Sequence, residues 1–407
     1  MSLLASSRAA EPESRYAWAR LACALAAGSL ACVGNWTIVV ALPEVERAFG
    51  AARAGASFPY ACVMFGFAVG TLAMGRVVDR WGVVAPILAA AALLLVGYVA
   101  AGLSDDLLQY ALFHFVIGLG ASAGFGPLIA DVSHWFTKNR GLAVVIAATG
   151  SYLAGMIAPQ LFQMMMTAWG WRTAHLITGI GVAAALVPLA FVFRVRPAET
   201  ASAHAEASFA ARADVGLSPR ALQTLLVTAA FSCCVAMSMP QVHLVAYCGD
   251  LGYGVARGAD MLSLLFALGI VSRVGSGWLA DRFGGVAILL LGSFMQGVAL
   301  FLYLFFDGLA SLFVITAVFG LFQGGIVPMY AVITREFMPP REAGARIGLV
   351  MMATMLGMAF GGWISGLIYD LSGSYRMAFL NGLIWNLVNL ALAAWLFASP
   401  RGRLRPA

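Results

Sequence analysis

The chain has 407 residues, of which 62% are hydrophobic and 10% are charged, and its mean hydropathy is +0.90. A soluble domain carries about 25% charged residues, so this composition excludes a water-soluble globular protein and predicts a polytopic membrane protein. The formal net charge of +6 does not indicate nucleic-acid binding, because the basic residues follow the ends of the apolar segments. A transmembrane barrel is excluded because the apolar runs are continuous instead of alternating.

Charged or Gly/Pro-rich positions divide the apolar sequence into twelve predicted transmembrane helices, each about 20 residues long. In chain order these helices span residues 18–42, 58–78, 83–103, 106–131, 141–164, 171–193, 221–247, 258–280, 285–306, 309–334, 346–369 and 376–398. Residues 194–220 are rich in Ala, Ser and charge, which predicts a solvated linker between two six-helix bundles at 18–193 and 221–398. Residues 1–17 and 399–407 are expected to be short polar tails, and residues 1–17 do not resemble a cleavable signal peptide.

The distribution of basic residues predicts the orientation in the membrane. With the N-terminus in the cytoplasm, eighteen of the 24 Lys and Arg residues lie on cytoplasmic segments. Arg273 falls within the membrane, and five arginines fall outside: Arg47, Arg53, Arg172, Arg257 and Arg376. Both termini and the linker are therefore expected to be cytoplasmic.

The two predicted bundles carry related sequences. "GRVVDRWG" at residues 75–82 recurs as "GWLADRFG" at 277–284, and "WRTAH" at 171–175 recurs as "YRMAF" at 375–379. The offsets of 202 and 204 residues are nearly equal, which indicates a duplicated six-helix unit. A pseudo-symmetric pair of bundles predicts a central cavity and suits transport by alternating access.

The repeated motif resembles the signature of the major facilitator superfamily, which follows the second helix of each half. Its residues are Gly75, Asp79, Arg80 and Gly82, with a second copy at Gly277, Asp281, Arg282 and Gly284. The resemblance implies that these cytoplasmic charges lock the two bundles in the outward-open state. The alternative is that they only set the topology of a tight turn.

A narrower resemblance is to the monocarboxylate transporters and the oxalate/formate antiporter-like proteins. It rests on "WFTKNRGLAVVIAATGSYLAG" at 135–155, on "GLFQGGIVPMYAVITREF" at 320–337, and on "GWR" at 170–172. Lys138 and Arg140, in the basic cluster of the first stretch, are expected to belong to the cytoplasmic gate. The first-helix motif of the animal members is matched only by "GNW" at 34–36.

Arg273 gives the strongest indication of what kind of substrate the protein binds. It lies eight residues before Asp281, which places it roughly 12 Å along a helix and near the bilayer centre. A charged side chain there costs about 2.5–3.5 kcal/mol, and arginine does not deprotonate. No acidic residue is predicted near the middle of a span, so we expect the counter-ion to be the transported anion. Alternatively, the guanidinium binds backbone carbonyls or water, or reaches Asp131 or Asp250.

The family resemblance agrees, since an eighth-helix arginine binds the substrate carboxylate in these transporters. Further polar and aromatic residues at mid-depth are expected to line the cavity: Asn35, Trp36, Ser122, Tyr152, Gln241, Gln323 and Tyr330. For each of them the alternative is a role in helix packing or interhelical hydrogen bonding.

The charge of the substrate follows from the eleventh span. The oxalate-exchanging relatives use a second cation on that helix, whereas this chain has no charge between Arg346 and Asp370. One buried positive charge suits a small monoanion such as lactate or pyruvate. The candidates for proton coupling are His114, His243 and Asp250, because the aspartate that animal members carry one turn before the arginine is Gly269 here. The substrate carboxylate could instead carry the proton itself.

The expected function is secondary active transport of a small monocarboxylate, with a proton. The alternative is an organic-anion exchanger or uniporter without proton coupling. No span holds a set of residues typical of an enzyme, and the six cysteines show no metal-binding spacing, so neither a cofactor nor a metal is expected. We expect the protein to function as a monomer. Its expected location is the plasma membrane, specifically the inner membrane of a bacterium.

Overall fold

The computed structural model describes residues 13–195, 218–338 and 340–398. Within these ranges the chain is helical and contains no strand, which confirms the predicted all-α class. Eleven segments are long and apolar enough to cross a membrane, whereas the sequence predicted twelve.

The difference of one arises in the segment Arg140–Val192, which has 53 residues and counts as a single span. It contains the predicted helix 141–164 and all but the last residue of the predicted helix 171–193. A straight helix of that length would be about 80 Å long, far more than the ~30 Å hydrocarbon core. Gly170 breaks the helix with φ 78° and ψ 161°, so helical backbone lies on either side of this residue.

The chain divides into two compact units. One contains Met1–Ala51 and Phe58–Ala201, and the other contains Ala52–Ser57 and Ser202–Ala407. The bundle boundaries read from the sequence stay a prediction. The predicted tails lie mostly outside the described residues, as does most of the predicted linker.

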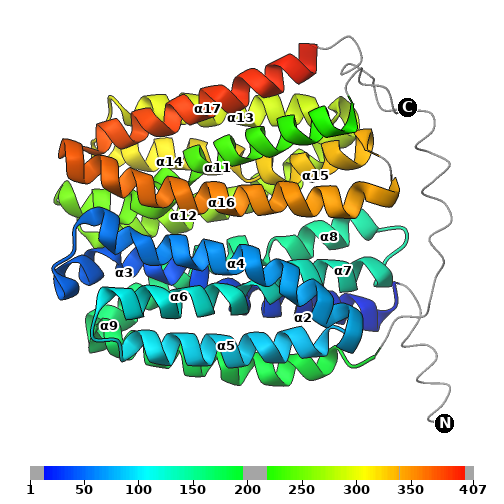
Figure 1. Cartoon of the computed structure of the whole chain (residues 1–407), viewed down its shortest axis with the longest axis horizontal. Coiled ribbons are helices and arrows are strands. Elements are labelled where there is room, and N and C mark those ends of the chain that lie inside the picture. Colours follow the sequence, from blue (N-terminus) through cyan, green and yellow to red (C-terminus); the bar gives the residue numbers. More distant parts are fainter. Residues whose placement is uncertain (1–12, 196–217, 339, 399–407) are drawn as a thin grey trace. The chain divides into compact units, whose positions relative to one another are not determined.

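The helices of the first unit run along one another (Figure 1). They are α2 (Arg15–Cys32), α3 (Gly34–Phe49), α4 (Arg53–Trp81), α5 (Val84–Gly102), α6 (Leu107–Ala121), the 3₁₀ turn η1 (Ser122–Gly124), α7 (Gly126–Trp135), α8 (Arg140–Ala148) and α9 (Gly150–Val192). Helix α9 packs on α2, α3 and α5, and α5 also packs on α6. The first turn of α4, residues 53–57, groups with the second unit.

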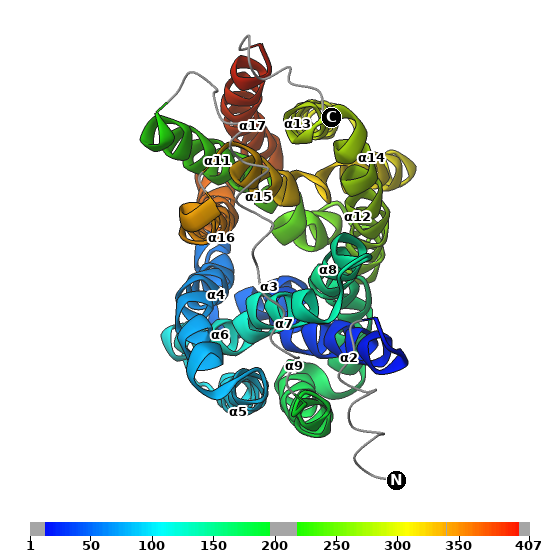
Figure 2. The same cartoon turned by 90° about the vertical axis from the view of Figure 1, so that its right-hand side faces the viewer.

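The second unit is also a helical bundle, seen nearly end on in Figure 2. Its helices are α11 (Pro219–Asp250), α12 (Val255–Phe283), α13 (Gly285–Tyr303), α14 (Leu309–Gln323), α15 (Ile326–Phe337), α16 (Pro340–Ser372) and α17 (Tyr375–Ala398). Helix α11 packs on α16 and α17, and α12 packs on α14.

Large apolar side chains remain exposed on the helices. On α4 they include Phe65 at 51%, Leu72 at 52% and Trp81 at 63% relative exposure. Such side chains form an aggregation-prone surface in water, but they match the hydrocarbon tails of a bilayer. The exposed faces therefore agree with a multi-pass membrane protein.

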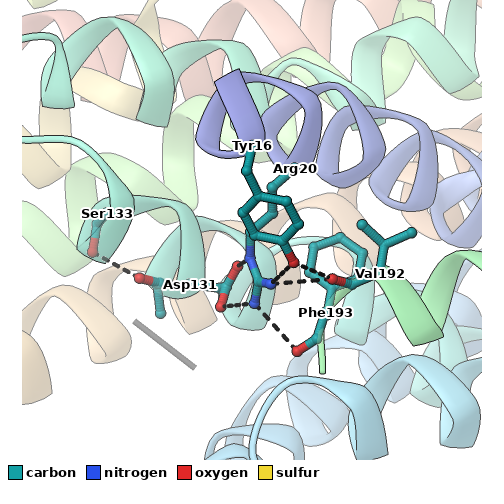
Figure 3. A network of polar contacts seen from close by, with 7 residues as sticks. Tyr16, Arg20, Asp131, Ser133, Val192 and Phe193 are labelled. Carbon is teal, nitrogen blue, oxygen red and sulfur yellow. Dashed lines mark hydrogen bonds and ion pairs between the residues drawn. The ribbon is translucent and has the colours of Figure 1, made fainter. Parts of the chain in front are cut away.

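A buried ion pair holds the first unit together at the start of α2. Arg20 is 2% exposed, and its Nε and Nη2 donate to the two carboxylate oxygens of Asp131 in α7 at 2.8 and 2.7 Å. The guanidinium also donates to the Tyr16 hydroxyl and to the carbonyls of Val192 and Phe193 at the end of α9 (Figure 3).

This network joins three segments that are far apart in sequence. The carbonyls of Val192 and Phe193 lie at the C-terminal end of α9, where backbone oxygens lack helical donors. Arg20 satisfies two of them and stacks on the rings of Trp135 and Phe193, with its Cζ 4.8 and 4.9 Å from the ring centroids. All three guanidinium nitrogens of Arg20 thus donate to oxygen atoms, which compensates for the desolvation of the charge.

Replacing Arg20 by Ala is expected to lower the free energy of unfolding by about 3–5 kcal/mol, because it leaves the Asp131 carboxylate buried without its cation. Chemical unfolding in detergent would measure the loss. The control is Arg257→Ala, since Arg257 pairs with Asp260 at the surface with 59% of its side chain exposed. That variant should lose less than about 1 kcal/mol. Equal losses in the two variants would contradict a stabilising role for the buried pair.

Candidate functional site

Arg273 lies in the middle of α12, within the second unit. The residue is 8% exposed, and its Nε donates to the backbone carbonyl of Gly324 at 3.2 Å. The neighbouring Ser272 accepts a hydrogen bond from the Gly325 amide at 3.1 Å through its Oγ. Two adjacent residues of α12 therefore bind two adjacent residues between α14 and α15.

The carbonyl of Gly324 is available because the helix is interrupted at this point. Helix α14 ends at Gln323 and α15 begins at Ile326. In a continuous helix the Gly324 oxygen would accept from the amide of residue 328, but that residue is proline and has no N–H. The Nε of Arg273 donates to the Gly324 oxygen in place of the missing amide. A contact of Arg273 with a backbone carbonyl was the alternative to substrate binding in the sequence analysis.

The predicted site residues of the second unit fall into two groups. Gln241 in α11 and Gln323 in α14 lie together, with the Nε2 of Gln241 donating to the Oε1 of Gln323 at 3.0 Å. Tyr330 in α15 is fully buried, and its hydroxyl donates to the Oδ1 of Asn389 in α17 at 2.7 Å. The side chain of Asn389 in turn donates to Ser293 Oγ at 2.8 Å, so Tyr330 belongs to a polar network inside this bundle.

The predicted residues of the first unit lie at two places. Trp36 in α3 donates through Nε1 to the carbonyl of Ser151 at 3.0 Å, which brings it beside the residue preceding Tyr152 in α9. Asn35 precedes Trp36 and is 6% exposed. Its buried Oδ1 has no hydrogen-bond partner among the described residues. Ser122, in the 3₁₀ turn, donates to the carbonyl of Leu119 at 2.7 Å.

A second charged cluster surrounds Arg53, at the first turn of α4. Arg53 is 5% exposed, and its Nη1 and Nη2 donate to the two carboxylate oxygens of Asp250 at 3.1 and 3.2 Å. The guanidinium also donates to the Tyr375 hydroxyl and lies over the Tyr369 ring at 4.6 Å. All of these residues belong to the second unit.

Asp370 caps the helix that Arg53 begins. Its two carboxylate oxygens accept from the backbone amides of Arg53 and Ala54 at 2.9 and 2.8 Å. The first amides of a helix lack internal acceptors and carry partial positive charge, so a carboxylate there stabilises the start of α4. We call Arg53, Asp250, Asp370 and Tyr375 the Arg53 cluster.

Sequence reasoning placed the charges of the Arg53 cluster on the outer side of the membrane but did not pair them. The usable signal was their topology: Arg53 lies just before the second predicted span (58–78), whereas Asp250 and Asp370 lie just after the seventh (221–247) and the eleventh (346–369). The two acids proposed as alternative partners for Arg273 are both bound to other arginines, Asp131 to Arg20 and Asp250 to Arg53.

Comparison with known proteins identifies the family. The Major Facilitator Superfamily profile matches residues 24–310 and 261–407. This chain belongs to the major facilitator superfamily of transporters. Its solved structural neighbours include a bacterial homologue of the human lysosomal transporter Spinster, captured inward-facing and occupied, with a TM-score of 0.76 and 13% identity over 97% of this chain and 100% of that one.

The curated relatives of this superfamily member include monocarboxylate transporters. Monocarboxylate transporter 13 of Bos taurus is 28% identical over 284 residues, which cover 66% of this chain and 64% of that protein. Monocarboxylate transporter 11 of Homo sapiens is 26% identical over 397 residues, which cover 91% of this chain and 81% of that one. The chain thus matches slightly less than two thirds of the cattle protein's length. These relatives are transporters and not enzymes.

The superfamily signature lies at the ends of α4 and α12. Gly82 and Gly284 have φ of 74° and 83°, a left-handed conformation that favours glycine, so both motif copies turn the chain sharply. Arg282 lies over the Trp278 ring with its Cζ 3.9 Å from the centroid. Arg80 and Asp281 are exposed, and the side chain of Asp79 lies outside the described part of the structure.

Gly75 and Gly277, the first glycines of the two motif copies, have open space where a side chain would begin.

The basic cluster before α8 is held by Glu13, whose carboxylate accepts from the amides of Thr137, Lys138 and Asn139. The hydrogen bond from the Asn139 amide is the largest of the contributions that lower the pKa of Glu13. The Nη2 of Arg140 lies 3.5 Å from the Ser133 hydroxyl. The role of these residues as a gate stays a prediction.

The histidine candidates have different environments. His114 lies in α6 with Nδ1 2.8 Å from the carbonyl of Tyr110, and its buried Nε2 has no described partner. Its ring centroid is 5.8 Å from that of His175, a buried histidine that sequence reasoning did not single out. His243 connects to the Arg53 cluster, since its Nδ1 lies 3.3 Å from the Tyr375 hydroxyl and its Nε2 donates to the Gly362 carbonyl at 2.7 Å.

Replacing Asp370 by Ala is expected to free the first turn of α4 and lower stability by about 1–2 kcal/mol, because two backbone donors lose a charged acceptor. Amide hydrogen exchange should accelerate at Arg53 and Ala54. Asp370→Asn keeps one acceptor oxygen and should lose less. Asp307→Ala, at an exposed aspartate after α13, is the matched control. Unchanged exchange at Arg53 in the alanine variant would refute the capping role.

Proposed function

We propose that this superfamily member is a secondary active transporter that moves a small monocarboxylate of the lactate or pyruvate type by alternating access. The observation that carries the proposal is the buried guanidinium of Arg273 in the middle of a membrane-spanning helix, oriented by the Gly324 carbonyl. Two curated relatives named as monocarboxylate transporters support it.

A guanidinium remains charged at all physiological pH values and presents a planar set of N–H donors that matches a carboxylate. In the low-dielectric interior its attraction for an anion is much stronger than in water. The carbonyl of Gly324 accepts a hydrogen bond from the Nε of Arg273 and so orients the guanidinium. A carboxylate that approaches this guanidinium gains a charge interaction that offsets the loss of its own hydration.

The charge pattern of α16 supports a monoanionic substrate. Between Arg346 and Asp370 this helix carries no charged residue, so it offers no second cation for a dicarboxylate. The polar pair of Gln241 and Gln323 provides amide groups in the same unit as Arg273. We assign Asn35, Trp36, Ser122, Tyr152 and Tyr330 to the cavity wall as a secondary part of the same proposal.

Arg273→Ala is expected to weaken lactate transport by about 30-fold or more in apparent affinity, because a buried charge interaction with the carboxylate is lost. Counterflow of radiolabelled lactate into proteoliposomes with equal protein would measure it. Arg273→Lys keeps the charge but loses the planar fork and the Nε bond, so it should be intermediate. Arg257→Ala, at the exposed start of the same helix, is the control. Near-normal counterflow by Arg273→Ala would refute the assignment, and inhibition by oxalate as strong as by lactate would refute the monoanion preference.

We further propose that transport is coupled to a proton. His243 is the favoured carrier and Asp250 its neighbour, since both connect to the Arg53 cluster; His114 in the first unit is the other candidate. The alternative, exchange or uniport without a proton, is favoured by Gly269, which leaves no carboxylate one turn before Arg273.

His243→Gln is expected to abolish lactate-driven proton movement while retaining lactate–lactate exchange, because the neutral amide cannot accept a proton. A pH-sensitive dye inside the proteoliposomes would report it. His114→Gln, at the other candidate, should retain proton movement; its loss there together with retention in His243→Gln would assign the proton to His114 instead. If both variants still acidify the lumen during uptake, the substrate carboxylate carries the proton. If the unmodified transporter moves no protons at all, the uncoupled alternative holds.

We also propose an orientation in the membrane and an oligomeric state. The excess of Lys and Arg on one side supports cytoplasmic termini, in the plasma membrane of a bacterium. We propose that Asp79, Arg80, Asp281 and Arg282 close the cytoplasmic gate together with Lys138 and Arg140, and that the monomer is the functional form.

A further inference from the structure

The interruption between α14 and α15 is fixed against α12 at close range. A Cβ added to Gly324 would lie 2.2 Å from the carbonyl oxygen of Gly269, and one added to Gly325 would lie 1.9 Å from Ser276 Oγ. Only glycine permits this approach of the two backbones. The Gly325 amide is held by Ser272 Oγ, so the peptide groups around Gly324 have little freedom to move relative to Arg273.

Pro328, four residues after Gly324, determines whether the Gly324 oxygen has a backbone donor in the next turn. The backbone at Gly324 is helical, with φ −61° and ψ −31°. The next turn would therefore supply a donor at residue 328, and Pro328 withholds it. The carbonyl is left to an external donor, and Arg273 Nε occupies that place at 3.2 Å.

We propose that Pro328 is a positioning residue for the substrate arginine: by leaving the Gly324 carbonyl without a helical donor, it provides the acceptor that orients the Arg273 guanidinium. The inference rests on the proposed function, because the orientation matters for transport only if Arg273 meets the substrate. Pro328 itself does not touch the anion.

The first unit supplies an internal comparison. Its fourth predicted span is interrupted in the same way, between α6 and α7, and Pro127 lies there at an offset of 201 residues from Pro328. At the repeat offset of 202, the residue matching Arg273 is Thr71 in α4, whose hydroxyl donates to the carbonyl of Phe67 in its own helix at 2.8 Å. Pro127 therefore interrupts the equivalent helix of the first unit, but the residue that corresponds to Arg273 there is a threonine.

The test is Pro328→Ala, which restores an N–H that competes with Arg273 for the Gly324 oxygen. In lactate counterflow the KM should rise about three- to tenfold, the range expected for one weakened hydrogen bond, while the maximal rate changes less than twofold. Pro127→Ala should leave the KM within twofold of the unmodified protein. A loss of affinity that is equal in the two variants, or absent in Pro328→Ala, would overturn the inference.

A double-variant comparison separates positioning from a general effect on helix packing. In the Arg273→Ala background, Pro328→Ala should cause no further change in KM, because the guanidinium that it orients is gone. An equal effect in both backgrounds would overturn the positioning role.

If Pro328→Ala does not fold, Ser272→Ala replaces it, since it releases the Gly325 amide and should raise the KM in the same way; an unchanged KM would overturn the inference. Normal counterflow by Arg273→Ala alone would instead refute the proposed function. Loss of affinity in Arg273→Ala with an unaffected Pro328→Ala would refute only the positioning role.

Discussion

A guanidinium stays charged inside the apolar interior of a membrane protein, so every buried arginine of this chain needs oxygen atoms around it. The structure meets this need in three ways. Arg20 binds a carboxylate and the free carbonyls at a helix end. Arg53 binds Asp250 and Tyr375 while its own backbone amide is capped by Asp370. Arg273 binds the carbonyl of Gly324 at an interrupted helix.

The three arrangements differ in the groups that the structure places against each arginine. At Arg20 and Arg53 a carboxylate of the protein supplies a full negative charge, which makes these sites suited to holding helices together. At Arg273 the described contact is with the backbone carbonyl of Gly324, which orients the guanidinium. The proposed substrate role of Arg273 rests on its burial within a membrane-spanning helix and on the similarity to monocarboxylate transporters.

An interrupted helix brings the contact of Arg273 about. Prolines at 127 and 328 follow Gly-rich turns in the fourth and tenth predicted spans, and each divides a span into two shorter helices. Backbone groups released at such interruptions bind side chains or substrates in many transporters. In the second unit the glycines at 324 and 325 add a close approach to α12, so the freed carbonyl lies directly beside the arginine.

The sequence by itself determined the all-α membrane class, the superfamily and the position of Arg273 in the middle of a span. These follow from local properties: apolar runs of the length of a bilayer, a repeated motif, and one arginine eight residues before the motif aspartate. It predicted two spans within Arg140–Val192, which counts as one 53-residue helical segment whose helix is broken at Gly170.

Only the tertiary structure decided which groups meet. Arg20 and Asp131 are 111 residues apart and Arg53 and Asp250 are 197 apart, so no spacing rule could pair them. The contact of Arg273 with Gly324 likewise depends on the packing of α12 against α14 at two glycines, which brings a carbonyl and a guanidinium within hydrogen-bonding distance. Composition and periodicity specify helices and their depth, but the partner of a charge depends on which helix faces lie side by side, and that is set by packing across the bundle.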